Sequence, residues 1–197
     1  MKKVAIFIFD DVEVLDFAGP FEVFNVAGEV NEPRPFEVYT VARTAEPVKA
    51  RGGLTIVPHY SIAEMPQPDM LLIPGGLGTR PLVNDAEIIA WIGAQRQEVE
   101  RLLSVCTGSL LLGKAGLLDG LEATTHHGAL DRLRDLAPGA TVRDDLRYVD
   151  NGEIVTSGGI SAGIDMALHI VRQTAGEAVV QNTLKEMEYD WAPLAQS

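Results

Sequence analysis

The chain has 197 residues, of which 46% are hydrophobic and 22% are charged, values usual for a soluble globular protein. Its 28 acidic and 16 basic side chains give a net charge of −12, which disfavours nucleic acid as a partner because the phosphates would be repelled. Cys106 is the one cysteine, so an intrachain disulfide is excluded. We expect one domain over residues 1–197.

Two further classes of protein are disfavoured by the sequence. The adjacent histidines His126 and His127 are not a metal motif, and no cluster of Cys and His has the spacing of a zinc site, so we expect no metal. The apolar N-terminal run is interrupted by Asp10 and Asp11 before it reaches the length of a signal peptide. No run is long enough to span a membrane. We therefore expect a cytoplasmic protein that does not bind membranes.

The apolar patterns alternate between strand and helix along the chain. The predicted strands are 4–9, 36–42, 70–73 and 101–105, with hairpins 48–50/54–57 and 146–149/153–156; the predicted helices are 12–27, 85–99, 110–114, 127–136, 162–173 and 178–188. Gly19-Pro20 is expected to kink or restart the first helix. The alternation predicts an α/β sandwich with a mostly parallel sheet, in which ligands bind beyond the carboxyl ends of the strands.

Cys106 lies where a predicted strand turns into a helix, next to the polar turn Thr107-Gly108-Ser109. The N–H groups and the positive dipole end of a helix favour a thiolate, which is the nucleophilic form of cysteine. A buried cysteine that acts only as a small hydrophobic side chain is the competing interpretation. Three segments fall at the same edge of the sheet: the acidic stretch after the first strand, the turn that begins at Pro74, and Cys106. Their convergence favours an active site.

Two glycine pairs end strands near this predicted site. Gly75 and Gly76 follow one strand, and Gly158 and Gly159 close another. Glycines allow the backbone to approach a ligand closely and to direct N–H groups at developing negative charge, although each pair is also compatible with a simple tight turn. No glycine-rich segment matches a phosphate-binding loop or a dinucleotide fingerprint.

A carboxyl group for proton transfer is sought among the acidic residues of the first helix. Asp16 lies between Leu15 and Phe17, and an apolar setting raises a carboxyl pKa so that the group can donate or shuttle a proton. Glu13 and Glu22 are competing candidates, and an exposed helix carboxylate is the alternative reading for any of them.

The histidines offer one candidate base. His126 and His127 place an imidazole within possible reach of Cys106, or His126 caps the helix that follows. His169 lies on an apolar helix face, which favours a core or interface role. Nothing in the sequence around His59 indicates a function for it.

The motifs together resemble the DJ-1/PfpI superfamily over nearly the full chain, and within it the isocyanide hydratases most closely. The segments that carry the resemblance are Val14-Leu15-Asp16, Gly19-Pro20, Ile73-Pro74-Gly75-Gly76, 104–109, 116–120, 123–126, 158–165 and Glu188-Tyr189. The resemblance implies a flavodoxin-like three-layer sandwich with a mostly parallel sheet, in which Cys106 occupies a nucleophile elbow. It also implies a homodimer.

The resemblance further implies roles for single residues. Cys106 would attack the terminal carbon of an isocyanide, Asp16 would donate or shuttle the proton, and Thr107 would position the carboxylate or water. The N–H groups of Gly75, Gly76 and Cys106 would hold developing charge, and no cofactor is required. Threonine after the cysteine, and aspartate at position 16, are similar to the hydratase branch, whereas peptidase-like members have histidine after the cysteine.

The substrate pocket is assigned to His126, His127 and Ile160. His127 stands where hydratase-like sequences have tryptophan, so we expect it to reshape the pocket. Other activities of Cys106 toward small molecules therefore stay open. A glyoxalase- or deglycase-type enzyme would use Cys106 on methylglyoxal, and a redox or stress sensor would oxidise Cys106 to a sulfinic acid. A partner-binding remnant of regulator proteins is a further possibility, against which the lack of a basic module counts.

Overall fold

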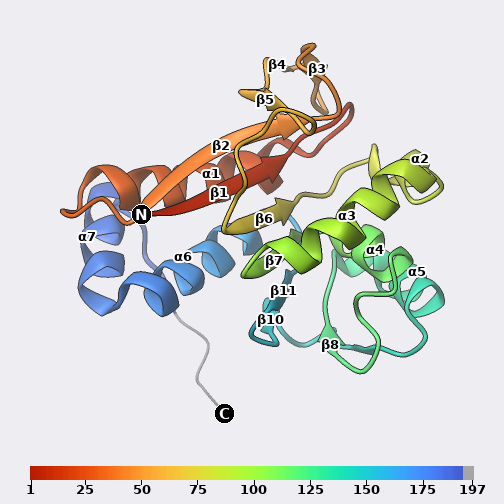
Figure 1. Ribbon diagram of the computed structural model, residues 1–197. Coiled ribbons are helices and arrows are strands. Elements are labelled where there is room, and N and C mark those ends of the chain that lie inside the picture. The colour runs from red at the N-terminus through yellow and green to blue at the C-terminus, as the bar shows by residue number, and fades with distance from the viewer. Residues whose placement is uncertain (193–197) are drawn as a thin grey trace.

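The structure is a computed structural model that describes residues 1–192, and its centre is a sheet between two layers of helices (Figure 1). The strands of this sheet are β1 (Lys2–Phe7), β2 (Phe36–Ala42), β5 (Tyr60–Ser61), β6 (Met70–Ile73), β7 (Arg101–Val105), β10 (Tyr148–Asp150) and β11 (Ile154–Ser157). Their order is β10-β11-β7-β6-β1-β2-β5, and all neighbours are parallel except β10 with β11. The predicted three-layer, mostly parallel α/β sandwich is confirmed.

The helices cover the two faces of the sheet. The first layer holds α1 (Val14–Glu29), α6 (Ala162–Ala175) and α7 (Glu177–Met187), which pack against one another. The second layer holds α3 (Ala86–Glu98), α4 (Gly108–Lys114) and α5 (Leu130–Leu136), with the short α2 (Thr79–Leu82) beside α4. Both faces are covered, so the central strands are continuous apolar runs rather than alternating ones; residues 4–7 of β1 are at most 1% exposed.

Two small sheets lie outside the central one. The predicted hairpin around Gly52 forms from β3 (Val48–Lys49) and β4 (Thr55–Ile56), which are antiparallel. A parallel pair that the sequence did not indicate forms from β8 (Glu122–Ala123) and β9 (Thr141–Val142). Strands of two residues give too short a pattern to be recognised by periodicity.

Two predicted helices differ from the structure. The helix expected over 12–27, with a break at Gly19-Pro20, is α1, which begins at Val14 and is continuous through Pro20 to Glu29. Tertiary packing holds it: Gly19 lies against Ile164 of α6 with no room for a Cβ. The helix expected over 127–136 is instead a 3₁₀ turn, η1 (His127–Ala129), followed by α5. The predicted cap of α3 is confirmed, because the Asp85 side chain accepts a hydrogen bond from the Ile88 N–H.

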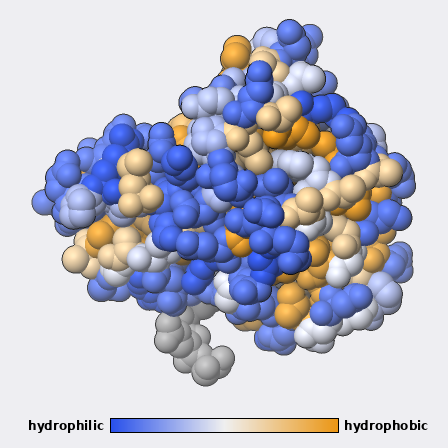
Figure 2. Space-filling model, in the orientation of Figure 1, coloured by the Kyte–Doolittle hydropathy of each residue, from blue (hydrophilic) through white to orange (hydrophobic). Residues whose placement is uncertain are grey.

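The surface in the view of Figure 2 is mainly hydrophilic, with hydrophobic side chains scattered among polar ones. In the part of the chain that is described, no helix combines the length and the apolar character that crossing a bilayer requires. The carboxyl ends of β1, β6, β7 and β11 lie at one edge of the sheet, and the loops that follow them bring the predicted site residues together.

Candidate active site

Cys106 occupies the turn between β7 and α4 with a φ of 57°, in the left-handed region that few residues other than glycine adopt. Its neighbours hold the strained backbone on both sides. The Cys106 N–H donates to the carbonyl oxygens of Ser157 and Gly158, each at 3.1 Å, and its own carbonyl accepts from the Thr125 hydroxyl at 2.8 Å. This strand–turn–helix geometry is that of a nucleophile elbow, as the family resemblance implies.

Asp16 lies directly beside the thiol, in the third residue of α1, and is 0% exposed. One carboxyl oxygen accepts from the Gly75 N–H and the other from the Ile160 N–H, both at 3.0 Å, and the Cys106 thiol hydrogen-bonds to the same group. Ile160 has a φ of 57°, so a second strained residue directs its N–H at the carboxyl group. The structure thus brings Cys106, Asp16 and Gly75 together as predicted.

Burial controls the pKa values of this pair. It raises the pKa of Asp16 to about 6, although the hydrogen bonds from Cys106, Ile160 and Gly75 act in the opposite direction. Burial and the charge of Asp16 raise the pKa of the Cys106 thiol to about 12. The prediction that this junction favours a thiolate is therefore wrong in direction, because a nearby carboxylate and an apolar setting outweigh the N–H groups at the start of α4. Both pKa shifts favour the protonated form of the group concerned.

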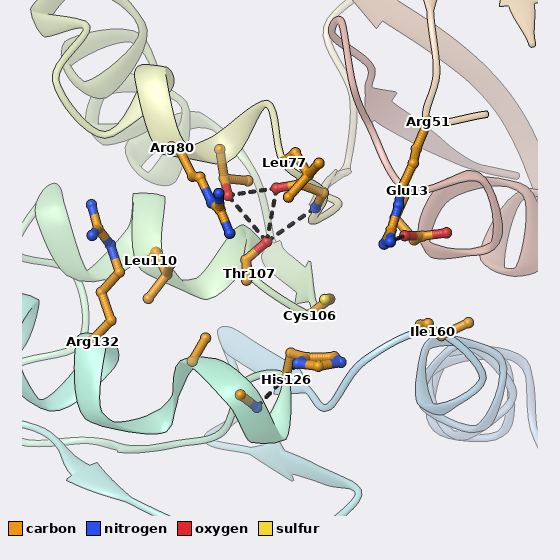
Figure 3. A pocket seen from close by; sticks show the side chains of 14 residues that line it. Glu13, Arg51, Leu77, Arg80, Cys106, Thr107, Leu110, His126, Arg132 and Ile160 are labelled. Carbon is orange, nitrogen blue, oxygen red and sulfur yellow. Dashed lines mark hydrogen bonds and ion pairs between the residues drawn. The ribbon is translucent and has the colours of Figure 1, made fainter. Parts of the chain in front are cut away.

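Thr107 organises the other side of the elbow. Its hydroxyl oxygen accepts from the Gly76 N–H at 3.0 Å and meets the Thr79 hydroxyl at 3.1 Å (Figure 3). Gly75 must be glycine here, since a Cβ would lie 2.6 Å from the Thr107 nitrogen. The N–H groups of Gly75 and Gly76, and that of Cys106, are thus engaged inside the protein. Their predicted role of holding charge on a substrate stays a prediction, and the hydrogen bonds observed give them a positioning role instead.

A cavity of about 540 Å³ opens above Cys106. Of the residues predicted for the substrate pocket, Ile160 and His126 line it, together with Gly76, Thr107 and Cys106 (Figure 3). The imidazole of His126 caps η1 through a 3.1 Å hydrogen bond from the Gly128 N–H, so the capping interpretation of this histidine is confirmed. Burial and the neighbouring His127 lower the pKa of His126.

Three predicted candidates lie away from the thiol. His127 is not among the lining residues; it is exposed and packs against the His126 ring, because the 3₁₀ turn directs it outward. Glu22 is exposed on α1. Glu13 lines the cavity but forms an ion pair with Arg51 at 2.7 Å rather than contacting Cys106. His169 is buried, and its Nε2 lies 2.7 Å from Asp150, on the core side expected for it.

Several lining residues carried no signal in the sequence. Leu77, Arg80, Leu110 and Arg132 come from loops and helices far apart in the chain, and each looks like an ordinary surface or helix residue by itself. The hairpin β3–β4 likewise brings Arg51 to the cavity. Within residues 1–192, no group of three His, Cys, Asp or Glu side chains is arranged to hold a metal ion.

The chain is similar in sequence to known proteins of one family. A model of the DJ-1/PfpI family matches residues 2–173. The chain is 36% identical over 191 residues to an isonitrile hydratase of Pseudomonas putida, covering 97% of this chain and 80% of that protein. It is also 30% identical over 152 residues to protein DJ-1alpha of Drosophila melanogaster, covering 75% and 69% of the two chains.

The chain is also similar to a solved structure and to part of a transcriptional regulator. A ThiJ/PfpI family protein from Pseudomonas syringae superposes with a TM-score of 0.86 at 31% identity, covering 98% of this chain and 77% of that one. The transcriptional regulator GbdR of Pseudomonas aeruginosa is 27% identical over 175 residues, but the alignment covers 89% of this chain and only 47% of the regulator. The shared part is therefore about half of that protein.

Proposed function

Because the chain belongs to the DJ-1/PfpI family, we propose that it is a cysteine-dependent hydratase that adds water to an isocyanide and releases an N-substituted formamide. The observation that carries the proposal is the Cys106–Asp16 pair: a thiol hydrogen-bonded to a buried carboxyl group whose pKa is raised to about 6, beneath a cavity of about 540 Å³. The similarity to an isonitrile hydratase supports it, since isonitrile and isocyanide are two names for the same functional group.

The first half of the reaction uses the resting thiol and carboxylate. The Asp16 carboxylate accepts the thiol proton and delivers it to the terminal carbon of R–N≡C, while the sulfur of Cys106 forms a bond to that same carbon. The product is a thioimidate, R–N=CH–S–Cys106, and Asp16 returns to its carboxylate form. A carboxyl pKa near neutrality suits this relay, because the group must both accept and release the proton.

The second half consumes one water molecule. Asp16 accepts a proton from water as the oxygen adds to the thioimidate carbon, and the nitrogen receives that proton. The carbon–sulfur bond of the resulting tetrahedral adduct then breaks, the hydroxyl proton passes to sulfur, and R–NH–CHO leaves. The Gly75 and Ile160 N–H groups hold the Asp16 oxygens in place throughout. Thr107, fixed by Gly76 and Thr79, faces the cavity where the water would bind.

Aldehyde chemistry of the glyoxalase type is the second candidate, and His126 is the observation that favours it. The ring lines the cavity, and its lowered pKa makes the neutral imidazole, a possible base, the main form at pH 7. However, a glyoxalase-type enzyme is expected to have a glutamate beside the thiol, and the carboxyl group there is Asp16. The His126 imidazole also already accepts a hydrogen bond from the Gly128 N–H. A sensor role for Cys106 is less well supported, because oxidation proceeds through the thiolate and the thiol pKa is raised.

The test is formamide production from phenyl isocyanide, followed by chromatography, for the wild type, Cys106→Ala and Asp16→Asn. We expect turnover by the wild type, none with Cys106→Ala and a sharp reduction with Asp16→Asn. Absence of turnover by folded wild-type protein would overturn the proposal for this substrate class. Methylglyoxal consumption in the same samples tests the aldehyde alternative, and mass spectrometry of Cys106 after mild peroxide treatment tests the sensor role.

A further inference from the structure

Two arginines of the cavity are unlike most others in this acidic protein. Of the eleven arginines in the chain, seven form an ion pair with a carboxylate and Arg172 stacks on Trp191. Arg80, Arg132 and Arg34 are left without a hydrogen bond, ion pair or ring contact of their guanidinium groups within residues 1–192. Two of these three line the same cavity. In a chain of net charge −12, cations left unpaired at one place call for a ligand that supplies the negative charge.

The placement of these arginines defines a second end of the cavity. Arg80 projects from α2 and Arg132 from α5, with Leu110 of α4 between them, whereas Ile160 lies at the opposite end and Cys106 lies between the two ends (Figure 3). The side chains of Leu77, Leu110 and Ala129 provide apolar lining. The cavity therefore has two guanidinium groups at one end, apolar side chains along its wall, and the Cys106 thiol further along.

The third cavity arginine does not belong to this anion site. Arg51 is neutralised by Glu13 at 2.7 Å, and the pair lies on the other side of the cavity from Arg80 and Arg132. Anion binding at Arg80 and Arg132 thus requires no existing ion pair to break. Guanidinium groups present paired N–H donors that match the two oxygens of a carboxylate.

We propose that the substrate is an isocyanide that carries a carboxylate, which Arg80 and Arg132 bind while the isocyano carbon meets Cys106. This inference rests on the proposed hydratase function for the identity of the reacting group, but the anion site itself does not depend on it. Both arginines are exposed, so their attraction is moderate and sensitive to salt. They contact a part of the substrate that does not change during the reaction, so they lower KM rather than raise kcat.

The kinetic test compares 4-isocyanobenzoate with its methyl ester, which has the same reacting group and a neutral end. We expect the ratio of kcat/KM for the acid to kcat/KM for the ester to fall about fivefold in Arg80→Met or Arg132→Met and about twentyfold in the double variant, mainly through KM for the acid. Arg34→Met is the matched control, since it removes an exposed, unpaired arginine outside the cavity, and it should leave the ratio unchanged. The wild-type ratio should also fall when the ionic strength rises from about 0.05 M to about 0.5 M.

A binding measurement separates failure of this inference from failure of the hydratase proposal. Calorimetric titration of Cys106→Ala with 4-formamidobenzoate and with its methyl ester requires no turnover. Preference for the acid that is lost with Arg80→Met and Arg132→Met supports the anion site even if neither isocyanide is hydrated. Equal affinity for acid and ester, or a preference that survives the double arginine variant, overturns it even if hydration is observed.

Discussion

The two ends of the central sheet each carry an aspartate with specific partners, and the two are treated in opposite ways. At the carboxyl end, Asp16 is buried, its partners are two N–H groups and a thiol, and the nearby charge of Glu13 is also negative, so burial raises its pKa to about 6. At the amino end, burial would also raise the pKa of Asp150, but the hydrogen bond from His169 and the charges of His169 and Arg101 outweigh it, and the pKa is lowered. The pKa of Asp150, which lies near Arg101, is lowered and the group contributes to stability, whereas the pKa of Asp16, which has no such partner, is raised, so that this group can move a proton.

The largest difference between the two ends should appear in activity. Asp16→Asn removes the proton acceptor of the thiol, so we expect kcat for isocyanide hydration to fall about a thousandfold. Asp150→Asn should leave kcat within about twofold and lower the free energy of unfolding by about 1 kcal/mol, the value of a charged hydrogen bond made neutral. Steady-state kinetics and urea unfolding of both variants measure the contrast. Comparable losses of activity in the two variants would mean that Asp16 acts only as part of the fold.

The pH dependence of stability should separate the two aspartates with opposite signs. The pKa of Asp16 is raised from 3.8 to about 6 on folding, so its contribution to stability is fully present below 3.8 and is lost as the pH rises through 6, by about 3 kcal/mol. The pKa of Asp150 is lowered, so its contribution is present above 3.8 and is lost only as the pH falls below that value. The stability of the wild type relative to Asp16→Asn should therefore fall as the pH rises from 4 to 7. Urea unfolding of both proteins over this range measures the difference in their free energies of unfolding. A flat difference would place the Asp16 pKa near its ordinary value.

The same pKa gives a kinetic expectation. Because the Asp16 carboxylate must accept the thiol proton, kcat/KM for a neutral isocyanide should fall about tenfold per pH unit below 6 and level off above it. Initial rates from pH 4.5 to 8 measure this limb, with circular dichroism as the control that the protein stays folded. The direction of the pH dependence shows whether Asp16 starts the reaction as a base or as an acid. If kcat/KM rises toward low pH instead, Asp16 acts as an acid that must start protonated.

The sequence predicts the central strands and the meeting of the site residues better than it predicts the thiol pKa and the lining of the cavity. Continuous apolar runs identify the central strands, and Asp85 marks the start of α3, because both signals are local. The proximity of Cys106, Asp16 and Gly75 follows from the rule that loops after parallel strands meet at one edge. The direction of the thiol pKa could not be predicted, because burial and the Asp16 charge outweigh the Thr107 N–H at the start of the adjacent helix. Arg80 and Arg132 carried no signal either, because their position in the cavity comes from how α2, α4 and α5 pack.

A smaller effect on activity is expected from the neutral hydrogen bonds of Thr107 at the site, which contrast with the ionic contacts of Asp150 at the amino end of the sheet. Thr107→Val leaves the Gly76 N–H without its acceptor and removes the hydroxyl that faces the cavity, whereas the Thr79 hydroxyl keeps the Gly76 carbonyl oxygen as its acceptor at 2.8 Å. We expect kcat/KM for phenyl isocyanide to fall about tenfold, the equivalent of one hydrogen bond of about 1.4 kcal/mol. Thr107→Ser keeps the oxygen and should recover most of the loss. Equal defects in both variants would assign the effect to the methyl group and its packing.

The smallest expected effect concerns backbone strain at the site compared with strain elsewhere. Ile160 at the site and Glu188 at the end of α7 both have positive φ values, 57° and 48°, but Ile160 is β-branched and its N–H must point at Asp16. Ile160→Gly should relieve about 1–2 kcal/mol of strain and lose part of it to the greater freedom of glycine in the unfolded chain, for a net gain of about 0.5 kcal/mol. Glu188→Gly should give a similar gain in unfolding free energy with unchanged kcat. A lower kcat with Ile160→Gly alone would indicate that the strained conformation positions Asp16, and equal kcat in both variants would show that strain at residue 160 affects only stability.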